Sequence, residues 1–464
     1  MCRRWPWATR PGSGGAATRS RPKPPVLLRT RAGRYSHPAR LTAPLAMARR
    51  PSILFVNQHY WPDVASTGQH LTDLAEHLVR AGFDVGVLCG QSGYKGQLDA
   101  PAHEVHNGVE ITRLRTTSFG RARHLGRIVD YGAFYAQVLA RLLTGPRVDL
   151  VVSLTTPPLL SFAASLAKRA RGQRYAIWSM DLHPDAEVAL GMLDEGGAAA
   201  RGLHALNDAG YRGADLVIDL GFRMKERIEA KGVRPERLTT IEVWSDGDEV
   251  YPVAPADNPL RRELGLRDDQ FVVMYSGNAG LAHRFDEVLE TMRRMKDDDR
   301  VFFLFVGGGP RKAEIEAFAQ SHGLRNFRYA NYFPREQLAE SLSVGDVHLL
   351  TLREAMAGIA VPGKLYGILA AGRPVVMVGP ERSEPARTIR EAGVGVVVDP
   401  AADGGRGGAD RLEAALRTLA DEPAERRATG ERAREVFLKH YDRPILCDAW
   451  AEALRAQIPT PVSV

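Results

Sequence analysis

Cysteine is scarce in this sequence: the 464 residues include three, Cys2, Cys89 and Cys447. They lie far apart and match no metal-binding spacing, which fits a reducing compartment and small apolar packing roles. Long apolar runs are also missing, because no stretch approaches the 18 residues that a membrane-spanning helix needs. The sequence therefore argues against a cysteine-based metal site and against an integral membrane protein.

Acidic residues are absent from the first 46 residues, which contain nine Arg and one Lys. Subtracting these ten charges from the net charge of +7 leaves −3 for residues 47–464, so the basic balance is no sign of nucleic-acid binding. The segment is rich in Arg, Pro, Gly and Ala without periodicity, which predicts disorder. It is either a transit peptide or the product of an upstream start codon. We favour the second, because Met47 directly precedes ARRPSILFVN, a natural beginning for a first strand.

Short apolar runs rich in Val, Ile and Phe alternate with helical segments through the rest of the chain. Continuous apolar strands separated by helices indicate parallel sheets that are covered on both faces. The strands form two series, separated by a polar, proline-containing stretch, SDGDEVYPVAPADNPLRRELGL, that is typical of a linker. The first series is 52–57, 84–89, 109–116, 149–154, 174–180, 215–220 and 238–244, and the second is 271–276, 301–307, 327–333, 347–352, 373–379 and 395–399.

Two strand series predict two domains. Because 13 strands are too many for one ordinary open sheet, we expect an α/β protein with two doubly wound, Rossmann-like parallel-sheet domains facing across a cleft. Ligands of such sheets bind beyond the carboxyl ends of the strands. We also expect the final helix to pack against the first domain, since it has few remaining partners in the second. The predicted divisions are a leader at 1–48, a first domain at 49–248, a second domain at 249–435, and a crossover helix with tail at 436–464.

The loop after the first predicted strand carries small polar residues. Ser66, Thr67 and Gly68 precede an apolar stripe that predicts a helix from about His70. Their backbone N–H groups and hydroxyls suit a phosphate or hydroxyl ligand. A plain helix cap with a turn glycine is the alternative.

A glycine-rich turn opens the second domain. Gly277 and Asn278 leave a strand, and His283 and Arg284 lead into a helix. Backbone amides and an arginine at such a corner favour a diphosphate, although a structural turn with a solvent-facing arginine is a rival interpretation. The later segment Gly307–Gly309 is interpreted mainly as a tight turn. If the diphosphate interpretation holds, this turn would also line the pocket for the nucleotide base.

Lys364 lies at the start of a predicted helix. Pro362 and Gly363 open this helix, because apolar residues then recur at helical spacing, and Gly372 with Pro374 ends it. A cation in the first turn is disfavoured by about 0.3–1 kcal/mol, because the helix dipole is positive there. An anion sharing that corner would remove the conflict, so Lys364 is a candidate anion ligand.

Polar residues also follow the strand YAIWSM. Asp181, His183 and Asp185 lie within five positions just past its end, where two carboxylates and an imidazole form an acid/base or sugar-hydroxyl site. Residues 119–143 combine arginines with aromatic and aliphatic residues. This pattern is typical of a surface helix with a buried apolar face, and it also suits peripheral contact with an anionic membrane.

Together these motifs resemble the retaining family-four nucleotide-sugar glycosyltransferases of GT-B fold, in the bacterial exopolysaccharide and O-antigen branch. The elements that carry the resemblance span roughly residues 50–440 in the order of the family, and the set is specific although each motif alone is weak. They are QHYWPDVASTGQHLTDLAEHLVRAGFDVGVL, WSMDLHPDAEVALGML, MYSGNAGLAHRFDEVL, FVGGGP and VPGKLYGILAAGRPVV.

The resemblance implies roles for particular residues. The donor would lie against the second domain and the acceptor against the first, with no metal or other cofactor. Cations would neutralise the charge that develops on the leaving nucleoside diphosphate. The implied catalytic residues are Asp181, Lys364 and Arg284; the donor-binding residues are Gly68, Gly277, Asn278 and Gly307; the acceptor-binding residues are His59, Thr67, His183 and Asp185. Glu354 and Glu384 are further donor-binding candidates, because the family's own pair of Glu residues is missing here and its contacts must come from elsewhere.

The expected reaction moves a hexose-type sugar with retention from a UDP-sugar, or second a GDP-sugar, to a lipid-linked or soluble glycan, the lipid-linked form being favoured. It would occur in the cytoplasm or at the inner face of the bacterial membrane during polysaccharide assembly. One departure from the family is that its pair of Glu residues is replaced by Ile359 and Gly367. Two alternatives therefore stay open: a non-hydrolysing nucleotide-sugar epimerase on the same fold, and a catalytically silent scaffold.

Overall fold

A computed structural model describes residues 49–93, 96–115 and 124–458 of the chain. The predicted leader lies outside these ranges, as do Arg121 and Arg123 of the basic segment. No helix in the described ranges is long and apolar enough to cross a membrane.

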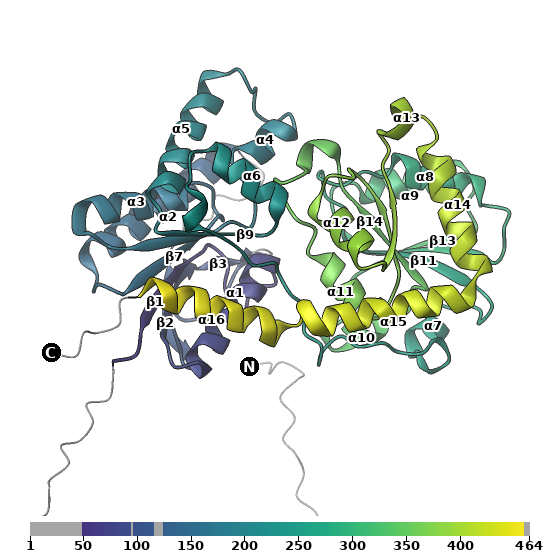
Figure 1. Cartoon of the computed structure of the whole chain (residues 1–464), viewed down its shortest axis with the longest axis horizontal. Coiled ribbons are helices and arrows are strands. Elements are labelled where there is room, and N and C mark those ends of the chain that lie inside the picture. The colour runs from purple at the N-terminus through teal and green to yellow at the C-terminus, as the bar shows by residue number, and fades with distance from the viewer. Residues whose placement is uncertain (1–48, 94–95, 116–123, 459–464) are drawn as a thin grey trace, which may run out of the picture. The chain divides into compact units, whose positions relative to one another are not determined.

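The first sheet has eight strands, all parallel except the edge strand β5, which pairs antiparallel with β6. We call this sheet and its helices the amino-terminal lobe (Figure 1). In spatial order its strands are β10 (Leu238–Thr240), β9 (Leu216–Asp219), β8 (Tyr175–Trp178), β7 (Leu150–Leu154), β1 (Ser52–Val56), β2 (Asp84–Gly90), β6 (Val109–Leu114) and β5 (His103–His106), with β3 (Ser92–Gly93) and β4 (Gly96–Gln97) forming a separate small hairpin. Its helices are α1 (Ser66–Arg80), α2 (His124–Thr144), α3 (Leu160–Arg171), α4 (Asp185–Ala189), α5 (Ala198–Gly213) and α6 (Phe222–Ala230).

The second sheet has six strands, all parallel, and with its helices forms the carboxy-terminal lobe. Its spatial order is β13 (Phe327–Ala330), β12 (Val301–Gly308), β11 (Phe271–Asn278), β14 (Val347–Thr351), β15 (Val375–Val378) and β16 (Gly395–Val398). Its helices are α7 (Pro259–Glu263), α8 (Asp286–Arg294), α9 (Lys312–Ser321), α10 (Leu338–Ser343), α11 (Lys364–Ala370), α12 (Glu384–Glu391), α13 (Ala402–Gly405), α14 (Gly408–Asp421) and α15 (Pro423–His440).

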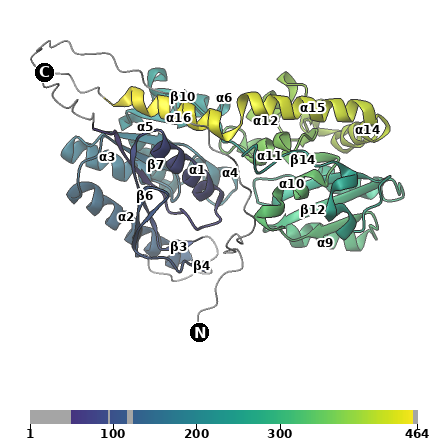
Figure 2. The ribbon, with the colours of Figure 1, turned by 90° about the horizontal axis from the view of Figure 1, so that it is seen from below.

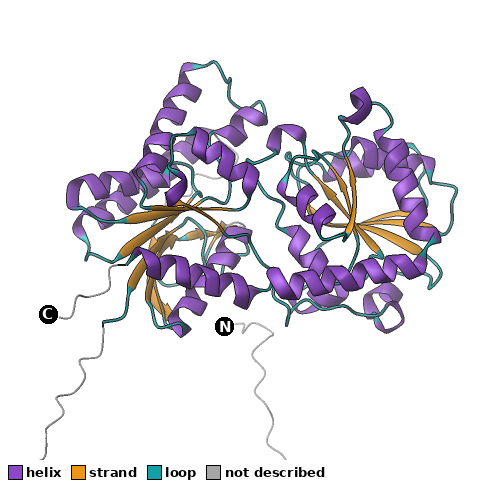
Figure 3. Cartoon of the chain, viewed as in Figure 1, coloured by secondary structure: helices purple, strands orange, loops and turns teal. Residues whose placement is uncertain are grey.

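Helices cover both faces of each sheet, as Figure 3 shows by colour. The central strands are accordingly buried along their whole length and mostly apolar: all residues of β7, β8, β14 and β15 are buried. This pattern is the physical reason why a continuous apolar run, rather than an alternating one, marks a strand in this chain. The predicted architecture of two doubly wound parallel sheets is confirmed.

The last helix, α16 (Arg443–Gln457), packs against α1 of the amino-terminal lobe, and Figures 1 and 2 show the two side by side. The predicted final helix is in fact two helices, because the chain breaks between α15 and α16. Asp442 caps α16 by accepting from the Arg443 N–H, and the same carboxylate oxygen accepts from the Gly247 N–H of the linker, both at 2.9 Å. The two connections between the lobes are thus bonded to each other.

Candidate functional site

The strand ends of β11 and β12 lie against each other without side chains between them. Gly277 pairs with Gly307, and both have positive φ, +127° and +134°. A Cβ added at Gly307 would lie 2.3 Å from the Gly277 carbonyl oxygen, a distance that no side chain tolerates. Glycine is therefore required at Gly307, and backbone groups line this carboxyl edge of the sheet, the edge where ligands of open α/β sheets bind.

Lys364 reaches this edge from the first turn of α11. Its ammonium donates to the Tyr275 hydroxyl at 2.7 Å and lies 4.0 Å from the centre of the same ring. A Cβ at Gly277 would lie 3.3 Å from Nζ, so the ammonium is adjacent to the end of β11. No carboxylate forms an ion pair with Lys364 among the described residues. Burial lowers the pKa of Lys364 to about 7, because the described residues supply no counter-ion that would favour the charged ammonium.

Tyr275 is a site residue that sequence reasoning missed. Inside the apolar strand MYSGN it reads as a core aromatic, and it is fully buried. Its hydroxyl donates to the Asn278 carbonyl at 3.0 Å and accepts from Lys364, so it fixes the lysine in place. Burial raises its pKa far above the ordinary value, and the phenol therefore stays neutral.

His283 occupies the same corner as a neutral side chain. Its Nδ1–H donates to the Thr351 carbonyl at 2.6 Å, which leaves Nε2 unprotonated and able to accept. Burial, helped by the charges of Lys364 and Arg311, lowers the pKa of His283 to about 3. This histidine can accept a hydrogen bond from a hydroxyl, and it adds no charge at neutral pH.

Arg284 is engaged within its own lobe. Its Nε donates to Glu287 at 2.6 Å and its NH2 forms a second, shorter bond to the same carboxylate. The hydrogen bond to Glu287 raises the pKa of Arg284, and the pair carries no net charge. Contact between Arg284 and a diphosphate stays a prediction, and it would require the ion pair to open.

The loop after β8 meets the segment before α11. Asp181 forms a β-bridge with Ala360, and the Leu182 N–H donates to the Ile359 carbonyl at 2.9 Å. Within the described ranges the Asp181 carboxylate accepts no hydrogen bond, and burial raises its pKa. The backbone of Asp181 is therefore paired with Ala360, which lies four residues before Lys364 in the chain. The Asp181 carboxylate is available for a ligand.

His183 and Asp185 have partners inside the amino-terminal lobe. His183 Nδ1 bonds Glu187 at 2.8 Å; burial disfavours its charged form, but the carboxylates of Glu187, Asp181 and Asp185 outweigh burial and raise its pKa. Asp185 accepts from Lys231 at 2.8 Å. Nε2 of His183 is therefore the ring nitrogen that could contact an acceptor sugar, whereas the Asp185 carboxylate forms a buried ion pair with Lys231.

Helix α1 begins at Ser66, four residues before the predicted start at His70, because the small residues of its first turn are themselves helical. Gly68 allows a close approach: a Cβ there would lie 3.2 Å from the His59 carbonyl carbon. Thr67 is partly exposed in the same turn, and His59 Nδ1 lies 2.6 Å from Asp63. Gly68 thus has a packing role that is sufficient to explain it, and its contact with the donor stays a prediction.

Glu354 and Glu384, the candidates to replace the missing Glu pair, lie in the segments that follow β14 and β15. Glu384 accepts from the Phe222 N–H at 2.7 Å and from Arg387 at 2.5 Å, so it joins the start of α12 to the start of α6 in the other lobe. The approach depends on Gly221, where a Cβ would lie 2.3 Å from the Glu384 carboxyl carbon. Glu354 is exposed in a short turn at Glu354–Met356.

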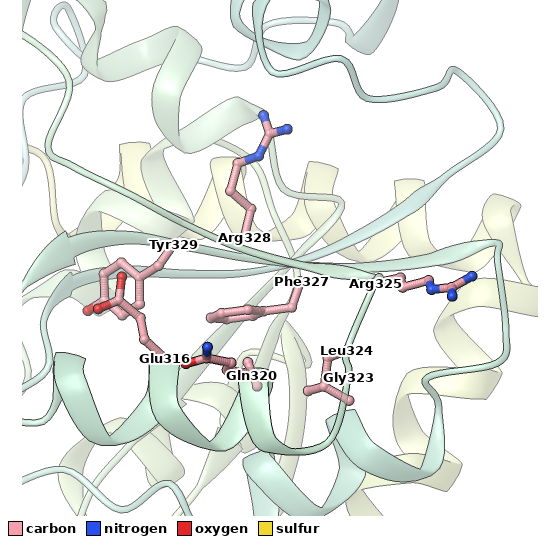
Figure 4. Close-up of a pocket in the computed structure, with 9 residues that line it drawn as sticks. Glu316, Gln320, Gly323, Leu324, Arg325, Phe327, Arg328 and Tyr329 are labelled. Atoms are coloured by element: carbon pink, nitrogen blue, oxygen red, sulfur yellow. The ribbon is translucent and has the colours of Figure 1, made fainter.

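A separate groove lies elsewhere, between α9 and the edge strand β13. Figure 4 shows Phe327 directed toward α9, where Glu316 and Gln320 lie, and Arg328 directed to the opposite face. The groove has a volume of about 500 Å³ and is lined by none of the residues at the ends of β11 and β12. Because ligands of open α/β sheets bind at the carboxyl ends of the strands, and Lys364 lies there, we assign the site to the strand ends around Lys364 rather than to this groove. Within the described ranges, no group of three or more His, Cys, Asp or Glu side chains is arranged to hold a metal ion.

Comparison with known families agrees with this geometry. Residues 65–244 match the glycosyl transferase 4-like domain, and residues 257–436 match the glycosyl transferases group 1. The chain belongs to the GT-B glycosyltransferases of family four. The two matches cover the two lobes in order, and the junction between them falls in the linker.

Relatives place this glycosyltransferase in the polysaccharide branch. It is 26% identical to a protein of Escherichia coli K12 that carries the name colanic acid biosynthesis glycosyl transferase WcaI, over 75% of this chain and 88% of that protein. Among solved structures, WaaG, a glycosyltransferase involved in lipopolysaccharide biosynthesis, is similar with a TM-score of 0.65 and 20% identity, covering 86% of this chain and 99% of WaaG. HepE of Anabaena in complex with UDP-glucose has a TM-score of 0.64 at 15% identity, covering 87% and 99% of the two chains.

Proposed function

We propose that this glycosyltransferase moves a sugar from a UDP-sugar to a lipid-linked glycan acceptor, with retention of anomeric configuration, in the assembly of a cell-surface polysaccharide. The observation that carries the proposal is the uncompensated ammonium of Lys364 beside Gly277. A nucleoside diphosphate is an anion of the right charge to complete that ion pair, and the solved HepE complex shows that the fold accommodates UDP-glucose.

The proposed chemistry follows from the charges. Breaking the sugar–phosphate bond builds negative charge on the leaving diphosphate, and a fixed cation stabilises that charge more than it stabilises the intact donor. Lys364 supplies the cation, and the Tyr275 hydroxyl holds it in place before the donor arrives. Asp181 lies on the facing loop, where its carboxylate would orient a sugar hydroxyl. The acceptor attacks from the side on which the diphosphate departs.

The acceptor would approach from the amino-terminal lobe. His183 Nε2 is the ring nitrogen that would contact its hydroxyl, because Glu187 already engages Nδ1. A lipid-linked acceptor would also bring the enzyme to the inner face of the membrane. Phe134, Val138 and Leu142 of α2 are buried, which shows that the apolar face of this helix packs inside the lobe. Membrane contact through α2 would therefore rest on its polar face.

Transfer assays test the proposal. The full chain is incubated with radiolabelled UDP-glucose, UDP-galactose or a GDP-sugar, with and without a lipid extract of bacterial membranes. We expect label to enter the lipid fraction with wild type, and Lys364→Ala to reduce the rate at least 100-fold while the far-UV circular dichroism is unchanged. Isomerised sugar nucleotide without lipid would identify an epimerase. Wild-type turnover by Lys364→Ala would refute the assigned role.

A further inference from the structure

Tyr332 is exposed beside the strand ends that the proposed donor would occupy. It follows β13, and 59% of its surface is open to solvent. A Cβ at Gly307 would lie 3.1 Å from Tyr332 Cζ, and a Cβ at Gly308 would lie 3.8 Å from Cε2. The ring therefore rests on the two glycines at the end of β12, with more than half of its surface facing outward.

Tyr332 lies one strand away from the strand end that Lys364 reaches. Its ring lies against Gly307, and Gly307 pairs with Gly277 of β11. A Cβ at Gly277 would in turn lie 3.3 Å from Lys364 Nζ. Exposure of one aromatic would by itself mean little, because single exposed apolar side chains are normal on protein surfaces. The position next to a lysine without a counter-ion is what sets Tyr332 apart.

The spacing of the sheet fits a nucleotide. Strands β11, β12 and β13 are neighbours in that order. Adjacent strands lie about 4.8 Å apart, so β13 is about 10 Å from β11. A nucleotide whose diphosphate is bound by Lys364 and which extends along the strand ends toward β12 would place its base at β13. Gly307 and Gly308 have no side chains, so the Tyr332 ring that rests on them is the surface that a nucleotide crossing β12 would meet.

We propose that Tyr332 is the platform on which the base of the donor nucleotide stacks. The inference rests on the proposed function and deepens it by naming the residue that recognises the nucleoside. Stacking reads the flat face of a base and tolerates uracil and guanine alike, so Tyr332 would supply affinity for a nucleotide, and hydrogen bonds elsewhere would select which one. A sugar phosphate without a base would gain nothing from this residue.

Binding of UDP and of inorganic pyrophosphate to the full chain, measured by isothermal titration calorimetry, tests the proposal. Alanine substitution of a base-stacking aromatic weakens binding about 10- to 100-fold, and we expect Tyr332→Ala to lose that much affinity for UDP. Pyrophosphate affinity should stay unchanged, because pyrophosphate has no base. Tyr332→Phe keeps the ring and should bind UDP within about threefold of wild type. Tyr251→Ala, which removes a tyrosine that is 47% exposed on the linker, is the matched control and should bind both probes normally.

Each other outcome overturns the inference. Wild-type affinity of Tyr332→Ala for UDP would show that no base stacks on it. Equal losses for UDP and pyrophosphate would show that Tyr332 supports the phosphate site rather than the base. If the wild-type protein binds UDP and GDP no more tightly than pyrophosphate, or binds none of the three, the proposed function fails as well. Failure of the Tyr332 inference alone is therefore distinguishable from failure of the proposed function.

Discussion

Binding of UDP should weaken steeply as pH rises above 7, because Lys364 loses its proton in that range. Burial lowers the pKa of Lys364 to about 7 in the free protein, well below the usual value for lysine. A bound diphosphate favours the charged ammonium, so the pKa rises again in the complex, and above pH 7 the protein must take up a proton to bind. The second pKa of a phosphate group is about 6, so UDP itself changes little in this range.

The magnitude follows from the fraction of charged lysine in the free protein. If only that form binds, the Kd rises about fivefold from pH 7 to pH 8 and about 50-fold from pH 7 to pH 9. Titration calorimetry in buffers of different ionisation enthalpy should show uptake of about half a proton at pH 7 and about one at pH 8.5. Lys364→Met should bind weakly with a flat profile. A wild-type Kd that changes less than threefold between pH 7 and 9 would refute the reasoning.

Three further predictions concern stability. Burial raises the pKa of Glu384 to about 7, so between about pH 4.5 and 7 the folded chain holds a proton that the unfolded chain has lost. The free energy of unfolding, measured by urea denaturation, should therefore fall by up to about 3 kcal/mol as pH rises through this range. Glu384→Gln should remove most of this pH dependence, and an unchanged pH profile would contradict the assignment. Gly309→Ala would place a Cβ 2.4 Å from Asn278 Oδ1 at a φ of +123°, and should cost at least about 2 kcal/mol, more than the control Gly323→Ala, which meets nothing within 4 Å; equal costs would refute the clash. Asp442→Ala removes the carboxylate that accepts from the Gly247 N–H and one of the two acceptors of the Arg443 N–H, the other being the Ser245 carbonyl, and should lower the free energy of unfolding by about 1–2 kcal/mol, whereas Asp442→Asn should retain most of it; similar losses in both variants would mean that the cap does not matter.

Apolar runs were sufficient to predict the sheets. All 13 predicted strands occur in the structure within a few residues of their predicted ends, because buried parallel strands need apolar residues on both faces. The edge strand β5 escaped prediction because three of the four residues in its sequence, HEVH, are polar, and the fourth, Val105, is exposed. Its signal is pairing with β6, which depends on a turn rather than on composition.

Residues of the candidate site that a local backbone feature marks could be predicted from the sequence. The side-chain partners of other candidate residues could not. Lys364 and Gly277 follow from the conflict between a cation and a helix start and from a turn at a strand end. The engagement of Arg284 by Glu287, and of Glu384 by the Phe222 N–H, depends on packing that no local pattern encodes. Tyr275 was hidden for the opposite reason, since a tyrosine in an apolar strand is indistinguishable from core.

The position of the diphosphate in a crystal structure with bound UDP tests the central claim most directly. We predict a phosphate oxygen within about 2.7–3.2 Å of Lys364 Nζ, at the ends of β11 and β12. An ammonium that still contacts only Tyr275, with the diphosphate bound elsewhere, would contradict the account.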